Sequence, residues 1–220
     1  MTLPHLETLV VKNCNLTGSL VWSLRSQCSR ALVVVDLAEN GVSGSFHDAS
    51  TFTACPKLNT LNLSRNSIDF NGGLKPIGIS VEWILSNGCQ ELRHLSVKGN
   101  KITGNLPEFD CPNLEYIDLF ANNFSSGFPS FHDCSSLEYL DLSSNKFSGD
   151  ISGALSSCKR LSFLNLTQNQ FTCEISSFLV DSNIRRRPHR LKTKKWRVRL
   201  EKEYEEVHVA VHVALENFDY

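Results

Sequence analysis

Several features are absent from this 220-residue sequence, and each absence excludes a class of protein. No run of 18 or more apolar residues occurs, so we expect no membrane-spanning helix. The amino end, MTLPHLETLVV, has neither a basic segment nor an apolar core, so we do not expect it to be a signal peptide. The eight cysteines are below the density of a small disulfide scaffold.

An excess of charge of one sign is also absent, since 22 basic and 23 acidic residues give a formal net charge of −1. This balance excludes a chain that is polycationic throughout, as a nucleic-acid coat protein would be. The average conceals two unlike parts, because residues 185–220 hold ten basic and six acidic side chains against twelve and seventeen before them. A hydrophobic fraction of 41% argues against disorder of the whole chain.

An internal repeat dominates what is present. The eleven-position pattern LxxLxLxxNxL starts seven times, at Leu6, Leu32, Leu58, Leu92, Leu114, Leu137 and Leu161. Apart from one interval of 34, the starts are 22 to 26 residues apart, within the roughly 20–29 residues of leucine-rich repeats. The pattern predicts an α/β-type leucine-rich-repeat solenoid with a parallel β-sheet on its concave side. Irregular or 3₁₀ segments are expected on its convex side.

Position nine of the pattern is an asparagine in six repeats and Cys14 in the first. An amide placed where the chain leaves the strand can bond backbone groups that have lost their ladder partners. Stacked copies are therefore expected to form a structural asparagine ladder. Its members are Asn40, Asn66, Asn100, Asn122, Asn145 and Asn169.

Six cysteines also recur at one place, three or four residues before the next repeat begins. They are Cys28, Cys55, Cys89, Cys111, Cys134 and Cys158. Because cysteine behaves as a small buried hydrophobe, we expect a ladder of reduced core residues. Disulfides between neighbouring repeats are the alternative, and a metal cluster is disfavoured because no CxxC spacing occurs. Cys14 and Cys173 lie off this ladder and are candidate free thiols.

We divide the chain into a solenoid of about seven repeats at 1–175 and a non-repeat tail at 176–220. No polar cap precedes the first repeat, so the chain is expected to begin inside a longer solenoid. The 34-residue interval after Leu58 is either a surface loop or a repeat that keeps only its end, VEWILSNGC. The second interpretation is favoured because a repeat's end is recognisable there.

The tail is basic and then acidic, and we expect it to be flexible and outside the fold. Residues 185–199 contain nine Lys or Arg, which is typical of a nuclear-localisation or nucleic-acid patch, or of a segment that binds anionic lipid. The favoured alternative is unselected, solvated sequence, so no nucleic-acid partner is expected. Residues 207–215 alternate in polarity, which predicts a strand if they fold.

Four N-x-S/T sequons are candidate N-glycosylation sites: Asn15, Asn62, Asn123 and Asn165. Two lie at position five, facing out of a predicted strand, and two lie at position ten in the following turn. All four are expected to be accessible, as in a glycosylated extracellular domain.

Aromatic residues gather at position three, which faces outward from the predicted sheet. Rings in four consecutive repeats predict an exposed aromatic stripe, flanked by charged side chains that include a solvated carboxylate pair. The candidate contact residues are Arg93, His94, Lys98, Tyr116, Asp118, Phe120, Tyr139, Asp141 and Phe163. Aromatic side chains on a rigid surface are typical anchors for a partner. The competing interpretation, favoured by how commonly apolar groups are exposed, is that the rings pack laterally and contact no partner.

Residues 3–175 resemble the early extracellular repeats of plant brassinosteroid receptor kinases, which are leucine-rich-repeat receptor-like kinases. The resemblance rests on the repeats, on the G-x-L/F-P form at Pro107 and Pro129, on the Cys-x-x-Leu spacing and on WILSNGC. It implies a location on the extracellular side of the plasma membrane. It also implies a protein or peptide partner, or a co-receptor, on the concave face.

The resembled family also has a signal peptide, a cap, a steroid-holding island domain, a membrane helix and a kinase. None of these is recognisable here, and no Gly-rich loop, HRD or DFG motif occurs. We therefore expect a truncated, non-enzymatic binding module without catalytic residues, cofactor or metal, and no steroid hormone as its ligand. The alternative is a structural spacer or a non-functional gene product.

Overall fold

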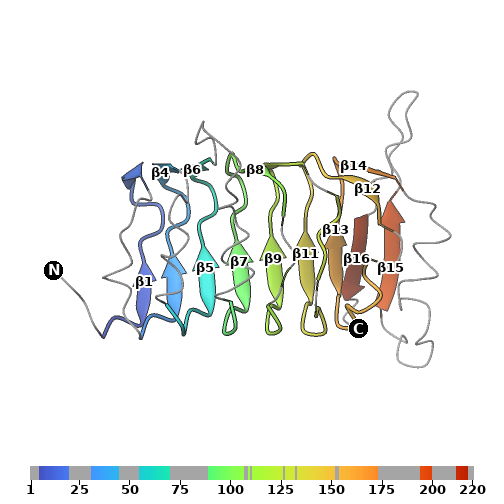
Figure 1. Cartoon of the computed structure of the whole chain (residues 1–220), viewed down its shortest axis with the longest axis horizontal. Helices are drawn as coiled ribbons and strands as arrows, with labels where there is room; N and C mark the ends of the chain where they lie inside the picture. The colour runs from blue at the N-terminus through green and yellow to red at the C-terminus, as the bar shows by residue number, and fades with distance from the viewer. Residues whose placement is uncertain are drawn as a thin grey trace.

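The computed structural model describes residues 5–19, 31–44, 55–69, 89–106, 109, 111–125, 127–131, 133–151, 154–172, 194–199 and 212–217. Among these residues it contains only short strands, turns and bends, and no helix. Most of the strands lie side by side along one long axis (Figure 1).

Each of the seven repeats contributes one strand to a parallel sheet. The strands are β1 (Thr8–Val10), β3 (Val34–Asp36), β5 (Thr60–Asn62), β7 (His94–Ser96), β9 (Tyr116–Asp118), β11 (Tyr139–Asp141) and β13 (Phe163–Asn165). They pair in this order, and equal positions of neighbouring repeats face each other, as Tyr116 faces Tyr139. The predicted leucine-rich-repeat solenoid with a parallel sheet is confirmed. We call the face that presents positions three and five the concave face.

The core is formed by the inward-facing apolar positions of the repeat. At position four, Leu61, Leu95, Ile117, Leu140 and Leu164 are at most 2% exposed. Burial of such a side chain contributes about 2 kcal/mol each, and in a solenoid that burial comes only from adjacent repeats. The first repeat has a neighbour on one side, and its Leu6 and Leu9 are only partly buried.

After each strand the chain turns through a left-handed residue at position eight. Glu39, Arg65, Ala121, Ser144 and Gln168 have φ of 53–58°, and Gly99 has φ of 65°. The asparagine that follows binds backbone groups of its own repeat and of the preceding one. The Asn122 Nδ2 donates to the carbonyls of Val97 and Leu119, each at 3.1 Å, and its Oδ1 accepts from the Ile102 amide at 3.1 Å.

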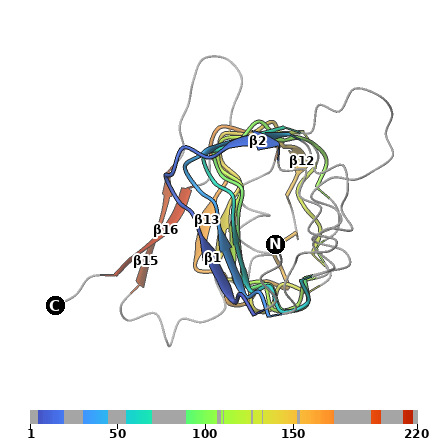
Figure 2. The same cartoon turned by 90° about the vertical axis from the view of Figure 1, so that its left-hand side faces the viewer.

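Beyond the asparagine, the chain forms short strands that the sequence reasoning missed. They are β2 (Thr17–Ser19), β4 (Gly41–Gly44), β6 (Ser67–Ile68), β8 (Thr103–Gly104), β10 (Asn123–Phe124), β12 (Ser148–Asp150) and β14 (Gln170–Thr172). They pair in parallel as β2-β4-β6, β8-β10 and β12-β14. In the end-on view of Figure 2, the main sheet forms one side of the coil and these strands run along an adjoining side.

The expected ladder of reduced cysteines is wrong. Cys89 is bonded to Cys111 and Cys134 to Cys158, with Cα–Cα distances of 5.3 and 4.7 Å, and Cys55 is disulfide-bonded as well. These distances lie in the ordinary disulfide range, because successive repeats stack close together at this position. Cys28 and Cys173 lie outside the described residues, and within them Cys14 is a free, exposed thiol.

The tail differs from the expected flexible segment, because it contains two strands, and the second overlaps residues 207–215, whose alternation predicts a strand. Strand β16 (His212–Asn217) pairs antiparallel with β13, and β15 (Lys194–Arg199) pairs antiparallel with β16. These two segments therefore extend the sheet at its carboxyl-terminal end instead of lying apart from it (Figure 1).

The 34-residue interval adds no strand to the main sheet, since β5 pairs directly with β7. Most of the interval lies outside the described residues. No helix in the described part of the chain is long and apolar enough to cross a membrane.

Candidate interaction surface

The aromatic residues of position three form a continuous stack on the concave face. Tyr139 stacks on Tyr116 at 4.3 Å and on Phe163 at 4.2 Å, with interplanar angles of 15° and 3°. His94 meets Tyr116 at 6.0 Å in a tilted arrangement. Both faces of Tyr139 are thus covered by neighbouring rings, and the tyrosines and Phe163 are half-buried. The rings therefore pack laterally, as the competing interpretation predicts, while His94 at the end of the row is exposed.

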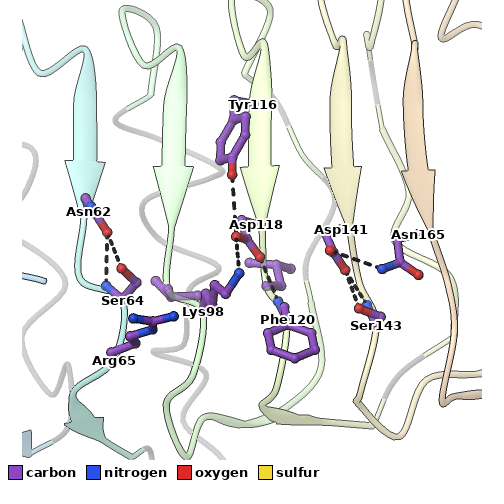
Figure 3. A network of polar contacts seen from close by, with 12 residues as sticks. Asn62, Ser64, Arg65, Lys98, Tyr116, Asp118, Phe120, Asp141, Ser143 and Asn165 are labelled. Carbon is purple, nitrogen blue, oxygen red and sulfur yellow. Dashed lines mark hydrogen bonds and ion pairs between the residues drawn. The ribbon is translucent and has the colours of Figure 1, made fainter. Parts of the chain in front are cut away.

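Beside the rings, position five forms a row of polar side chains, most of them fixed by the same local bond. The oxygen of Asp118 accepts from the amide of Phe120 at 3.1 Å, and that of Asp141 accepts from the amide of Ser143 at 2.9 Å. Asp36, Asn62 and Asn165 accept in the same way from the residue two positions later. Figure 3 shows this row across the ends of the strands.

The expectation that Asp118 and Asp141 are solvated is wrong. They are 3% and 6% exposed, because in-register neighbours crowd them from both sides. Besides its backbone bond, Asp118 accepts a hydrogen bond from the Tyr116 hydroxyl at 3.4 Å, and its Oδ2 lies 3.6 Å from the Lys98 Nζ. Asp141 accepts from the Ser143 hydroxyl and from the Asn165 Nδ2.

Burial shifts the pKa values of Asp118, Tyr116 and Tyr139. It raises the pKa of Asp118 above its ordinary value of 3.8, although the Phe120 amide and the Lys98 ammonium oppose the shift. Burial, together with nearby carboxylates, also raises the pKa values of Tyr116 and Tyr139. Both phenols therefore remain neutral hydroxyl groups at physiological pH.

The predicted cations of the surface are paired with acids. Arg93 bridges to Glu115, and Lys98 lies between Asp118 and the ring of Phe120, 4.9 Å from the ring centroid. Arg65, which the sequence reasoning did not single out, lies 3.4 Å from Glu39. The surface therefore presents aromatic rings and hydroxyl groups among paired charges, and these charges do not give it an excess of one sign.

The structure brings together eight of the nine candidate contact residues on β7, β9 and β11 or directly beside them, and Phe163 completes the stack on β13. Asn62 and Asn165 end strands as predicted, whereas Asn123, expected in a turn, begins β10. Asn15 is exposed, while Asn62, Asn123 and Asn165 are half-buried. No group of three metal-ligating side chains occurs in the described ranges.

Four sequence profiles of the leucine-rich repeat match the chain between residues 5 and 171. They cover residues 129–171 (Leucine rich repeat), 90–131 (Leucine Rich repeats, 2 copies), 54–75 and 5–27 (Leucine Rich Repeat). The chain belongs to the leucine-rich-repeat family. This agrees with the seven parallel repeat strands of the main sheet and with the turn asparagines described above.

Among curated proteins, the repeats are similar to brassinosteroid receptor kinases. An alignment of 175 positions that covers 71% of this chain gives 50% identity to the systemin receptor SR160 of Solanum peruvianum and to the brassinosteroid LRR receptor kinase of Solanum lycopersicum. It is 40% over 147 residues to the protein BRASSINOSTEROID INSENSITIVE 1 of Arabidopsis thaliana. The chain spans about 14% of the length of the first two relatives.

Solved plant receptor ectodomains share the architecture. The Arabidopsis receptor kinase HAESA, in complex with the peptide hormone IDA and the co-receptor SERK1, gives a TM-score of 0.63 at 28% identity. The match covers 78% of this chain and 27% of that one. Pollen Receptor Kinase 3 gives 0.61 at 24% identity, covering 76% and 75%, which supports the fold alone.

Proposed function

We propose that the concave face over β7, β9 and β11 binds a protein or peptide partner, as part of an extracellular domain related to the brassinosteroid receptor kinases. The observation that supports this is the ring stack of His94, Tyr116 and Tyr139 beside the Lys98–Phe120 pair on a rigid sheet. Side chains ordered in advance lose little conformational freedom on binding, so their contacts contribute more to affinity. The HAESA complex offers the precedent of a related ectodomain that holds a peptide hormone and a co-receptor.

The chemistry of the surface indicates which partner fits. Since its cations are already paired with acids, a partner would gain affinity from ring edges and hydroxyl groups more than from net charge. That pattern fits a peptide or a co-receptor loop with apolar and neutral polar side chains. Five cysteines in disulfides favour an oxidising, extracellular location. Kinase activity and hormone perception would belong to a longer receptor.

A structural role is the second candidate function. The observation that favours it is that Tyr116 and Tyr139 each pack against a ring on both sides. The ring faces are therefore covered without a partner. In this alternative the segment is a spacer that holds other repeats at a distance, and the rings stabilise the sheet without a partner.

Site-specific cross-linking distinguishes the two functions. A photoreactive phenylalanine analogue at Tyr116, in the chain displayed outside plant cells, should cross-link a discrete partner. The same analogue at Lys159, an exposed turn residue outside the sheet, should not. With the recovered partner purified, Tyr116→Ala with Tyr139→Ala should weaken binding about tenfold or more, as expected for aromatic anchors. An unchanged affinity, or the same cross-links from both positions, would establish the spacer.

A further inference from the structure

Two of the four sequons occupy the same position in different repeats and have the same geometry. Asn62 ends β5 and Asn165 ends β13, both at position five of the concave face. The Oδ1 of Asn62 accepts from the Ser64 amide at 3.1 Å and from the Ser64 hydroxyl at 2.7 Å. The Oδ1 of Asn165 accepts from the same groups of Thr167 at 3.2 and 2.9 Å. In each case the sequon's own hydroxyl residue orients the asparagine amide.

The nitrogen of each amide is held by a carboxylate of the preceding repeat. The Nδ2 of Asn62 donates to Asp36 Oδ2 at 3.1 Å, and that of Asn165 donates to Asp141 Oδ2 at 3.2 Å. A side-chain amide carries two N–H groups, and attachment of a sugar replaces one of them. The remaining N–H can keep its bond to the carboxylate, so glycosylation is compatible with the whole local network.

The two sites stand on either side of the proposed interaction surface. Between β5 and β13 lie β7, β9 and β11, which carry His94, Tyr116 and Tyr139. The separation is four strand steps, or about 19 Å at the usual spacing of parallel strands. Sugar chains at both ends would flank these three strands, and neither would be attached to any of the three.

We propose that Asn62 and Asn165 carry N-glycans that bracket the concave face and confine partner contact to β7, β9 and β11. The identity of the sites rests on their sequons and local geometry, without the proposed function. Their role in confining contact rests on the proposed function, and its test uses a designed binder, so that failure of one proposal does not decide the other.

Occupancy is tested first. The chain is secreted from plant cells with an added leader, and glycopeptides are measured by mass spectrometry. Both asparagines should be occupied. Ser64→Ala and Thr167→Ala should each abolish occupancy at their own site, whereas Ser64→Thr and Thr167→Ser should retain it. An unoccupied Asn62 or Asn165 in the secreted wild-type chain overturns the proposal.

The open surface is tested by placing a third glycan inside it. Residues 141–143 read Asp-Leu-Ser, so Asp141→Asn alone creates a sequon on β11. Ser143 already donates to residue 141 with its amide and its hydroxyl, as Thr167 does to Asn165. The probe is a synthetic nanobody that is selected on the glycan-free chain and loses binding when Tyr116 and Tyr139 are changed to Ala.

The nanobody should bind the glycosylated wild-type chain within about twofold of the glycan-free chain, and the glycosylated Asp141→Asn chain should bind at least about tenfold more weakly. The matched control, Asp141→Asn with Ser143→Ala, lacks the sequon and should recover binding. If the wild-type glycans themselves block the nanobody, or if the control stays as weak as the single variant, the open surface is disproved.

Discussion

The position-five aspartates show how far a residue's surroundings can depart from the strand pattern that places it. Alternation along the strand correctly puts Asp118 and Asp141 on the outward face of the sheet. They are nevertheless buried, because parallel in-register pairing stacks the same position of each repeat into one column. Beside this column, the position-three side chains form a second column of stacked aromatic rings. The direction in which a side chain points is therefore set by its own strand, whereas its exposure to solvent depends on the neighbouring strands.

This burial predicts a pH dependence. Because the folded state raises the pKa of Asp118 above 3.8, folding favours its protonated form. Its ionisation therefore lowers stability as the pH rises from about 4 through the raised folded value. Asp118→Asn cannot ionise, yet its amide oxygen can still accept from Phe120, as Asn62 accepts from Ser64.

The measurement is urea unfolding of wild type and Asp118→Asn at several pH values between 4 and 7. The difference in unfolding free energy, variant minus wild type, should increase with pH and then level off above the folded pKa. A difference that is independent of pH would show that Lys98 and the Phe120 amide fully offset the burial of ionised Asp118, and one that decreases would show that they outweigh it.

At the scale of the element, the cysteines convert a stack of repeats into covalently joined pairs. Each cysteine occupies an equivalent place, so any of them has two potential partners, one repeat before and one repeat after. A sulfur forms one disulfide, so Cys89–Cys111 and Cys134–Cys158 leave no bond between Cys111 and Cys134. That junction depends on packing and hydrogen bonds alone.

Removal of one such bond should be costly. Cys134→Ala with Cys158→Ala should lower the free energy of unfolding by roughly 3 kcal/mol, the loop-closure value for a separation of 24 residues. Cys14→Ala serves as the control, since this thiol is free and exposed, and it should change stability by less than about 0.5 kcal/mol. Urea unfolding under non-reducing conditions measures both. Equal effects of the two changes would contradict a structural role of the disulfide.

At the scale of the whole molecule, the two ends of the stack differ. At the amino end Leu6 and Leu9 are only partly buried, and Val10 is 57% exposed. At the carboxyl end Leu164 and Leu166 are 2% and 1% exposed, as deeply buried as the interior repeats, and β16 pairs with the edge of β13. In a linear stack, stability is a sum of nearest-neighbour terms, so the less covered end should open first.

Hydrogen exchange tests this order. Amides of β3 that bond to the first repeat, such as Val34, should exchange faster than those of β9, such as Tyr116, because opening the first repeat exposes only one interface. Mass spectrometry of peptides spanning each strand resolves the gradient. Uniform protection from β1 to β13 would instead show that the stack unfolds as a single cooperative unit.

Much of this protein is readable from local pattern. The spacing of leucines determines that strands recur and face inward at positions four and six, since each strand needs only its own alternation. The asparagine at position nine is likewise recognisable, because it follows the strand directly. The candidate contact residues follow from the same period, since in-register stacking brings equal positions together.

What only the tertiary structure decided are the properties that depend on the distance between repeats. The disulfides required Cα atoms 4.7 and 5.3 Å apart, a separation that residue spacing does not contain. The burial of Asp118, the closure of the ring stack around Tyr139 and the pairing of β16 with β13 arise in the same way from contacts between segments. The sequence by itself determined the period and the face of each repeat's strand in the main sheet. Side-by-side packing determined which side chains are covered, bonded or left open, because exposure and bonding are properties of neighbours in space.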